Sequence, residues 1–128
     1  SGKPLAQALG AFTRELTSES GIRVAFEVRG TCDLDPVAED ELFRIAQQAL
    51  TNVRQHAQAK TAAVTLECMK RAARLTIEDD GIGFDVRRIP AVRHGIVGMR
   101  ERARAAGGTL RITSKRGEGT RVVATVRR

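Results

Sequence analysis

Apolar residues recur along this chain at two different spacings. In residues 4–19 they fall three or four positions apart, which predicts an amphipathic helix. In residues 22–28 they alternate with polar residues, which predicts a half-buried strand, and Gly21 between these segments is typical of a helix C-cap. Residues 29–34 are then expected to form a loop.

A second helix is predicted to begin at Asp35-Pro36. The carboxylate can cap the first turn, and proline is favoured at the first helical position. The helical spacing continues to about Ala57. The apolar face of this helix is expected to consist of Leu42, Ile45, Ala49, Leu50 and Val53.

The second half of the chain favours strands around one short helix. Alternation predicts two strands that include residues 64–68 and 75–77, then a final hairpin around Gly117-Glu118-Gly119. Residues 85–94 are expected to be an exposed loop, and residues 96–106 a helix. The resulting order, α-β-α-β-β-loop-α-β-β, predicts an α/β (α+β) two-layer sandwich with all helices on one face of a mixed sheet.

Length and composition indicate one domain, residues 1–128, without a membrane span or a secretory signal. Cys32 and Cys68 form no CxxC or Cys/His cluster, which argues against zinc. Each cysteine is expected to be a buried free thiol. A cytoplasmic location is the corresponding expectation.

The net charge of +7 attracts polyanions in general. The arginines are dispersed along the chain, however, and it contains no Trp or Tyr on which bases could stack. We therefore expect a solvated basic surface, with no specific nucleic-acid partner and no membrane contact. Weak, salt-dependent association with DNA is the alternative that charge alone supports.

Gln48, Asn52 and His56 are four residues apart, so they lie on one side of the second helix, beside its apolar face. The Asn52 carbonyl oxygen is a hard ligand that suits Mg²⁺, which typically keeps several waters and shares phosphate oxygens. An ordinary solvated helix edge is the alternative interpretation.

A carboxylate-glycine turn, Asp79-Asp80-Gly81-Ile82-Gly83, follows a predicted strand. The carboxylate of Asp79 can accept a hydrogen bond from an amino group such as that of adenine, whereas it repels phosphate. The glycines allow a ligand to approach the backbone closely. A capped glycine turn without a ligand fits the same residues.

Two further glycine pairs complete the set of candidate motifs. Gly95 and Gly98 are expected to open a helix, where free N–H groups attract phosphate. Arginines flank this segment, at positions 87, 88, 93 and 100. The other pair belongs to Gly117-Glu118-Gly119-Thr120, which alone indicates only a tight turn. Neither segment is a Walker A loop.

Taken together, these four segments resemble the N, G1, G2 and GxGT boxes of the GHKL ATP-binding fold, also called the Bergerat fold. This superfamily includes histidine kinases, DNA gyrase B, Hsp90 chaperones, MutL and anti-sigma serine kinases. The segment HGIVGMRER at 94–102 is similar to sensor histidine kinases of the NarX and DesK-like group, which partner LuxR/NarL-type response regulators. The resemblance implies a mixed, mostly antiparallel sheet with helices on one face.

The resemblance also implies roles for individual residues, with ATP and Mg²⁺ as cofactors. Asn52 would bind Mg²⁺, Asp79 would contact the adenine amino group, and Thr120 would lie near the adenine. The remaining residues of the implied nucleotide site are His56, Gly81, Gly83, Arg93, Gly95, Gly98 and Met99.

The catalytic positions implied by the resemblance are Gln48 and Asn52. The family usually has Glu where this chain has Gln48, and often Lys or Arg where it has Gln55. Glutamine lacks the basicity to activate water. Phosphoryl transfer to an imidazole depends mainly on positioning and charge neutralisation, so Gln48 argues against a gyrase-like hydrolase more than against a kinase.

The only histidines, His56 and His94, both lie within the nucleotide motifs. The chain therefore looks like the catalytic domain of a kinase whose dimerisation and phosphoacceptor domain lies elsewhere. The implied partners are that domain and a LuxR/NarL-type response regulator, with a monomeric fragment and a homodimeric full protein. An anti-sigma-type serine kinase and a degenerate ATP-binding module are the alternatives.

Overall fold

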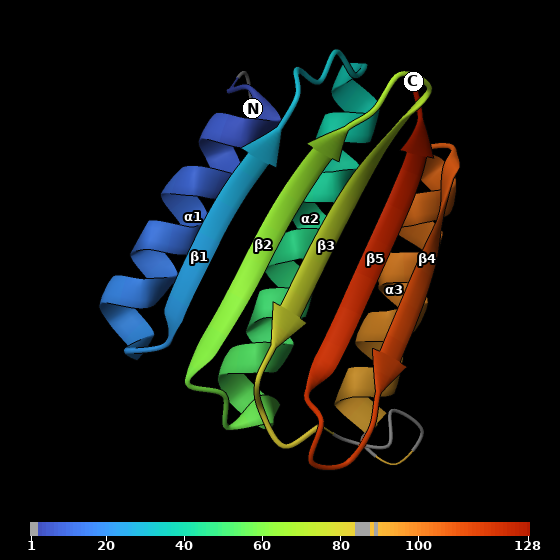
Figure 1. Cartoon of the computed structure of the whole chain (residues 1–128). Coiled ribbons are helices and arrows are strands. Elements are labelled where there is room, and N and C mark those ends of the chain that lie inside the picture. The colour runs from blue at the N-terminus through green and yellow to red at the C-terminus, as the bar shows by residue number, and fades with distance from the viewer. Residues whose placement is uncertain (1–2, 84–87, 89) are drawn as a thin grey trace.

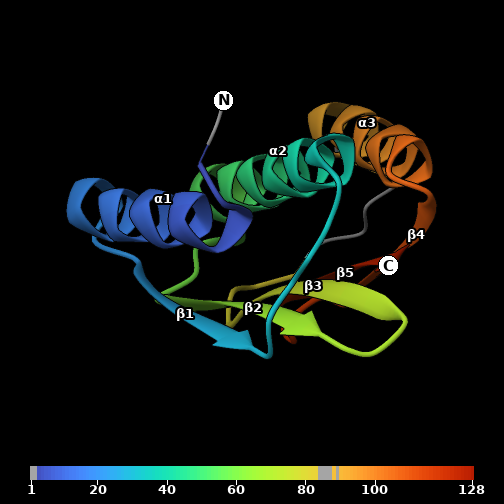
Figure 2. The same cartoon turned by 90° about the horizontal axis from the view of Figure 1, so that it is seen from above.

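Three helices cover one face of a five-stranded sheet (Figures 1 and 2) in the computed structural model, which describes residues 3–83, 88 and 90–128. This arrangement confirms the expected two-layer sandwich and the order of its elements. The elements are α1 (Leu5–Ser20), β1 (Arg23–Arg29), α2 (Pro36–Asn52), the π-helical turn η1 (Val53–Ala57), β2 (Thr61–Cys68), β3 (Ala72–Asp79), α3 (Pro90–Ala105), β4 (Gly108–Ser114) and β5 (Thr120–Arg127).

The sheet has the strand order β1-β2-β3-β5-β4. Among the described strands, only the β1–β2 pair is parallel, and α2 provides the crossover that a parallel neighbour requires. The other three pairs are antiparallel, which confirms the mixed, mostly antiparallel sheet. In this register, Asp79 at the end of β3 pairs with Thr120 at the start of β5.

The core lies between the helices and the sheet. Leu42, Ile45 and Leu50 of α2 are fully buried there, as the helical spacing predicts. On the opposite face, polar side chains pair across strands, as Arg121 Nε does with Glu78 Oε1 at 3.1 Å. One face of the sheet is thus apolar and the other meets solvent, as is common for antiparallel sheets.

Two predicted helix ends are confirmed. Asp35 Oδ1 accepts a hydrogen bond from the Ala38 N–H at 2.8 Å, and Pro36 is the first residue of α2. Gly21 adopts a left-handed conformation (φ +77°) and donates its N–H to Thr17. These caps mark where α1 ends and where α2 begins.

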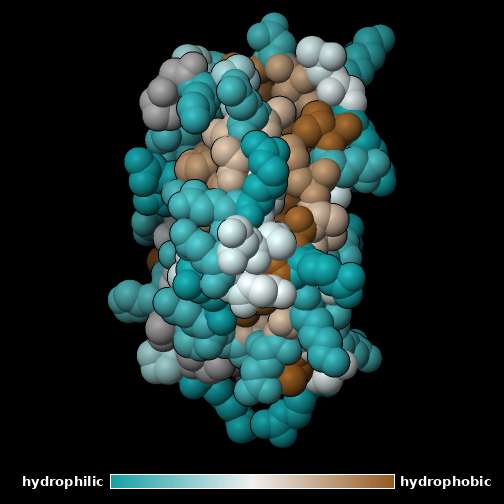
Figure 3. Space-filling view, turned by 90° about the vertical axis from the view of Figure 1, so that its left-hand side faces the viewer, coloured by the Kyte–Doolittle hydropathy of each residue, from teal (hydrophilic) through white to brown (hydrophobic). Residues whose placement is uncertain are grey.

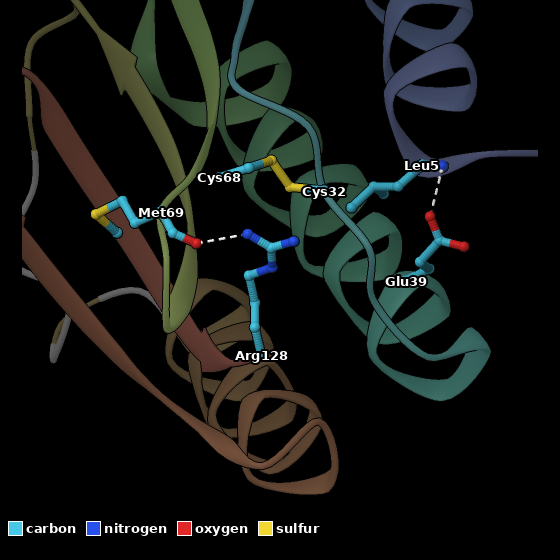
Figure 4. The surroundings of a disulfide bond; sticks show 6 residues. All are labelled: Leu5, Cys32, Glu39, Cys68, Met69 and Arg128. Atoms are coloured by element: carbon cyan, nitrogen blue, oxygen red, sulfur yellow. Dashed lines mark hydrogen bonds between the residues drawn. A yellow bond between two sulfur atoms is a disulfide. The ribbon is translucent and has the colours of Figure 1, made fainter.

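The helix α1 covers the edge strand β1 only in part. Val24 and Phe26 are half-buried, and Val28 is 40% exposed. Figure 3 looks at this side of the molecule and shows an apolar strip between hydrophilic side chains. The N-terminus of α1 is held to α2, because the Leu5 N–H donates to Glu39 Oε2 at 3.0 Å (Figure 4).

The start of α3 differs from the sequence prediction. Residues 85–94 are expected to form a loop and the helix to begin near residue 96, but α3 begins at Pro90. Proline is favoured at the first helical position, and the buried residues Val92, Met99 and Ala103 continue one helical stripe from that point. The expectation for residues 84–87 and 89 falls outside the described residues.

The expectation of two free thiols is wrong, because Cys32 and Cys68 form a disulfide (Figure 4). Cys32 lies in the loop after β1, and Cys68 is the last residue of the neighbouring strand β2. The parallel register, in which Arg29 is opposite Glu67, brings these two segments together. Within the described part of the chain, no helix is long and apolar enough to cross a membrane.

Candidate functional site

The C-terminal end of α2 carries the first group of candidate residues. Asn52 is the last residue of α2 and is 9% exposed. Its Oδ1 accepts a hydrogen bond from Gln48 Nε2 at 3.3 Å, so the spacing of four residues brings these side chains together as predicted. The expected α-helix ends here and η1 follows, a wider turn of the kind that is frequent at functional sites. His56 lies in η1 and is half-buried.

Asp79 ends β3 with a half-buried carboxylate. Its Oδ1 accepts a hydrogen bond from the Gly81 N–H at 2.8 Å. Burial raises the pKa of this carboxyl, and the nearby charge of Asp80 acts in the same direction, whereas the N–H groups of Gly81 and Thr120 oppose the shift. Asp79 is therefore a hydrogen-bond acceptor held in a partly apolar environment.

The neighbouring carboxylate, Asp80, has a different role. Its Oδ1 accepts from the N–H groups of Lys60 and Thr61, at 2.9 and 3.0 Å, and its Oδ2 accepts from the Thr61 hydroxyl at 2.9 Å. The bonds from Thr61 lower the pKa of Asp80. Asp80 thus fastens the end of β3 to the start of β2, which leaves Asp79 as the carboxylate of the candidate site.

The glycine turns allow close backbone approaches around Asp79. A Cβ at Gly81 would lie 2.2 Å from the backbone oxygen of Ala57, and a Cβ at Gly119 would lie 2.1 Å from the backbone oxygen of Asp79. Gly119 also has φ +75°, which favours glycine. Through these contacts the end of η1, the turn after β3 and the β4–β5 turn lie together at one end of the sheet, at the bottom of Figure 1.

Three polar side chains from distant parts of the chain converge on one small cavity beneath α3. Asn52 comes from α2, Asp79 from β3 and Thr120 from β5. The Thr120 hydroxyl shares a hydrogen bond of 2.8 Å with the Ser114 hydroxyl. The rest of the lining is apolar and includes Ile77 and Met99. A few polar groups in a mostly apolar lining are typical of a small-molecule binding site.

A polar groove between α2 and α3 lies next to this cavity, and Met99 lines both. Gln48, Thr51 and His94 contribute hydrogen-bonding groups to the groove, and Gly95 and Gly98 line its α3 side. A Cβ at Gly95 would lie 2.7 Å from Gln48 Nε2, so glycine leaves room for that amide. The groove therefore provides polar contacts beside a largely apolar cavity.

The expectation that Gly95 and Gly98 open a helix is wrong. Both lie inside α3, where their N–H groups are positioned for bonds within the helix rather than to an anion. Arg93 is exposed, Arg88 is exposed, and Arg100 donates to the Leu110 oxygen at 3.0 Å. Arg87 lies outside the described residues.

Some predicted site residues do not line the cavity or the groove. They are His56, Gly81, Gly83 and Arg93. Two residues that sequence reasoning did not single out, Val92 and Ile96, do line the cavity. The helical spacing of Val92, Ile96, Met99 and Ala103 was the signal that could have identified this face of α3.

The described residues contain no cluster of three or more His, Cys, Asp or Glu side chains that could hold a metal ion by themselves. Asn52 Oδ1 offers one hard oxygen at the margin of the cavity. Such a donor fits Mg²⁺, which is often bound through one or two protein groups together with substrate phosphates and water.

Residues 37–128 match the family described as histidine kinase-, DNA gyrase B-, and HSP90-like ATPase. The chain is 33% identical over 121 residues to the sensor histidine kinase LiaS of Bacillus subtilis, covering 94% of this chain and 33% of that protein. It is 31% identical over 122 residues to the nitrate/nitrite sensor protein NarX of Escherichia coli, covering 94% and 20%.

The fold is also similar to that of a solved histidine kinase domain from Erythrobacter litoralis, part of a blue-light activated kinase. The TM-score is 0.73, with 25% sequence identity, and the match covers 96% of this chain and 60% of the other. The chain thus spans about a third or less of the length of the curated relatives named above.

Proposed function

The chain belongs to the family of histidine kinase-, DNA gyrase B- and HSP90-like ATPases, and from this premise we propose that it binds Mg-ATP at the cavity and groove beside α3. In the complete protein, it would donate the γ-phosphoryl group to a histidine of a dimerisation domain. That phosphoryl group would then pass to a response regulator, with a LuxR/NarL-type regulator as the specific proposal.

The observation that carries this proposal is the convergence of Asn52, Asp79 and Thr120 on one cavity. Asp79 would accept a hydrogen bond from the adenine amino group, and Thr120 would support the base through its hydroxyl. The polyphosphate would follow the adjacent groove, past Gln48 and Gly95. The cavity would thereby read the base, and the groove would hold the charged part of the nucleotide.

Asn52 would hold Mg²⁺ through Oδ1, and the ion would supply charge neutralisation for the transferred phosphoryl group. The Gln48 amide orients Asn52 by donating to the same oxygen, which retains a second lone pair. Gln48 itself has no basicity with which to activate water. The residues therefore support transfer to an imidazole by positioning, with little competing hydrolysis.

Isothermal titration with ATP tests the proposal directly. We expect binding that is tighter in the presence of Mg²⁺, and we expect Asn52→Ala to remove most of the Mg²⁺ dependence. Gln7→Ala serves as the matched control, because this exposed amide side chain of α1 lines neither the cavity nor the groove. Absence of binding at millimolar ATP with Mg²⁺ would contradict the proposal.

A degenerate ATP-binding module is the second candidate, because Gln48 and Gln55 replace residues that the family usually uses. The two functions differ in phosphoryl transfer, not in nucleotide binding. The test is to incubate the chain with radiolabelled ATP and a purified dimerisation domain from the same full-length protein. Label on the histidine of that domain supports the kinase, whereas binding of ATP without transfer supports the degenerate module.

A further inference from the structure

Three polar residues form one row across neighbouring strands beside the candidate cavity. Asp79 of β3 is opposite Thr120 of β5, and Thr120 is opposite Ser114 of β4. The three strands are adjacent in the sheet (Figure 1), and the alternation along each strand places these side chains on its helix-covered face. Asp79 and Thr120 line the cavity, whereas Ser114 is half-buried on the other side of Thr120. Any effect of Ser114 on a ligand in the cavity therefore acts through Thr120.

The Ser114 hydroxyl is hydrogen-bonded to two consecutive residues of the β4–β5 hairpin. It donates to the Gly119 backbone oxygen at 3.3 Å, and it shares a bond of 2.8 Å with the Thr120 hydroxyl, in which either oxygen can be the donor. Because a hydroxyl has one proton to donate, both bonds form together in only one order. Thr120 donates to Ser114, and Ser114 donates to Gly119. The Thr120 oxygen then offers a lone pair to the cavity, and not its proton.

We propose that Ser114 is a positioning residue for base recognition, which fixes the Thr120 hydroxyl as a hydrogen-bond acceptor beside the Asp79 carboxylate. The cavity thereby selects a purine with an exocyclic amino group over a purine with an oxygen in its place. This inference rests on the proposed function, because it concerns the base of the same nucleotide.

Two neighbouring acceptors match the chemistry of an amino group. The amino group of adenine has two N–H donors, one for Asp79 and one for Thr120. An oxygen at that position has only lone pairs, which would face the carboxylate and the hydroxyl oxygen without a proton between them. A buried polar group without a partner is costly. Asp79 supplies part of the discrimination by itself, and Ser114 adds the part that depends on the direction of the Thr120 proton.

Removal of the Ser114 hydroxyl frees the Thr120 proton. In Ser114→Ala, the Thr120 hydroxyl can turn and donate to an oxygen of the base, so the rejection of that base becomes weaker. A purely structural role, in which Ser114 only closes the turn through Gly119, would change the affinities for both bases alike. The ratio of the two dissociation constants therefore separates positioning from structural support.

The experiment is isothermal titration with Mg-ATP and with the magnesium complex of inosine triphosphate, which has an oxygen instead of the amino group and a proton on the adjacent ring nitrogen. We expect Ser114→Ala to lower the preference for ATP, as the ratio of the two dissociation constants, by about three- to tenfold, the range of one hydrogen bond. Thr113→Ala is the matched control and should leave the ratio unchanged. It also removes a hydroxyl from β4, but Thr113 is exposed on the opposite face of the sheet.

Thr120→Val tests the path from Ser114 to the base. Valine resembles threonine in shape but lacks the hydroxyl, so we expect this variant to lose a similar part of the preference for ATP. Ser114→Ala should then have no further effect on the ratio in the Thr120→Val background. Circular dichroism verifies that each variant is folded. An unchanged ratio in Thr120→Val would overturn the inference even where Ser114→Ala does not fold.

The possible outcomes separate the role of Ser114 from the nucleotide function. If ATP binds but Ser114→Ala leaves the ratio unchanged or raises it, the positioning role alone is overturned. An equal effect of Ser114→Ala with and without the Thr120 hydroxyl overturns it as well, because Ser114 would then not act through Thr120. If the unmodified chain does not bind millimolar ATP, the proposed nucleotide function fails, and the positioning role fails with it.

Discussion

The Gln48 side chain donates its amide N–H to Asn52 Oδ1 at 3.3 Å, one turn further along α2. A glutamate at position 48 cannot donate this bond, but it can accept a proton from water near a bound phosphate. We therefore expect Gln48→Glu to raise the slow hydrolysis of ATP by about tenfold or more. The measurement is release of inorganic phosphate at saturating Mg-ATP.

Gln7→Glu is the control for this change. It introduces the same charge at an exposed position of α1 that lines neither the cavity nor the groove. Equal hydrolysis by Gln48→Glu and Gln7→Glu would show that the base at position 48 does not limit the reaction.

The raised pKa of Asp79 predicts a pH dependence of nucleotide binding. Below that pKa the carboxyl is protonated and offers a poorer acceptor to an amino group, so ATP affinity should fall as the pH drops through it. Because burial is the main cause of the shift, this decrease begins at a higher pH than for an ordinary carboxyl. Asp79→Asn should lack this component of the pH profile, while titration of the ATP phosphates contributes equally to both proteins.

Asp79→Asn should also separate affinity from stability. The asparagine can present its N–H₂ to the adenine amino group, so we expect ATP binding to weaken by about ten- to a hundredfold.

The effect of Asp79→Asn on stability should be different. Asn Oδ1 can still accept the Gly81 N–H, and no buried charge remains. In the folded state Asp79 holds its proton more tightly than in the unfolded state. Its contribution to stability therefore decreases as the pH rises from the unfolded to the folded pKa. At neutral pH, the variant should unfold at the same urea concentration as the unmodified chain or at a higher one, and a large loss of stability would contradict this account.

The β4–β5 turn offers a matched pair of glycine substitutions. Gly117 and Gly119 both have positive φ, at +84° and +75°. A Cβ at Gly119 would lie 2.1 Å from the backbone oxygen of Asp79, whereas a Cβ at Gly117 would have no neighbouring atom within 4 Å. We expect Gly117→Ala to cost about 1 kcal/mol of unfolding free energy and Gly119→Ala roughly 3 kcal/mol or more. Equal losses in chemical denaturation would show that backbone conformation, and not contact with Asp79, determines the effect.

The Cys32–Cys68 disulfide should contribute measurably to stability. It joins residues that are 36 positions apart, and a loop of this length corresponds to roughly 3–4 kcal/mol in the chain-entropy description. Reduction with dithiothreitol should lower the unfolding free energy by about this amount, as measured by urea denaturation. The doubly substituted Cys32→Ser/Cys68→Ser chain should start from the lower value and should not respond to the reductant.

Local patterns were sufficient to predict most of this fold. Asp35-Pro36 and Gly21 mark helix ends because capping depends on neighbouring residues, and the alternation in residues 64–77 identifies two strands that are joined by a tight turn. The convergence of Asn52, Asp79 and Thr120 could be predicted only from the resemblance of the four motifs to those of a known fold. Nothing in their spacing alone specifies that β3 and β5 are neighbours or that α2 crosses above them.

The expectations that the structure corrects depend on contacts between distant segments. The disulfide forms because β1 and β2 are parallel neighbours in one particular register, which no short stretch of sequence reveals. The early start of α3 follows from burial of Val92 against α2 and the sheet, and this tertiary contact outweighs the loop-like appearance of residues around Pro90. In both cases the global packing decided between local alternatives.

The disulfide also gives the chain a closed covalent ring. The ring runs from Cys32 through α2, η1 and β2 to Cys68, and Gln48 and Asn52 lie within it. A single break of the backbone anywhere inside the ring leaves both fragments linked. The segment that carries the candidate metal ligand therefore remains attached to the sheet after proteolytic nicking, for as long as the disulfide is oxidised.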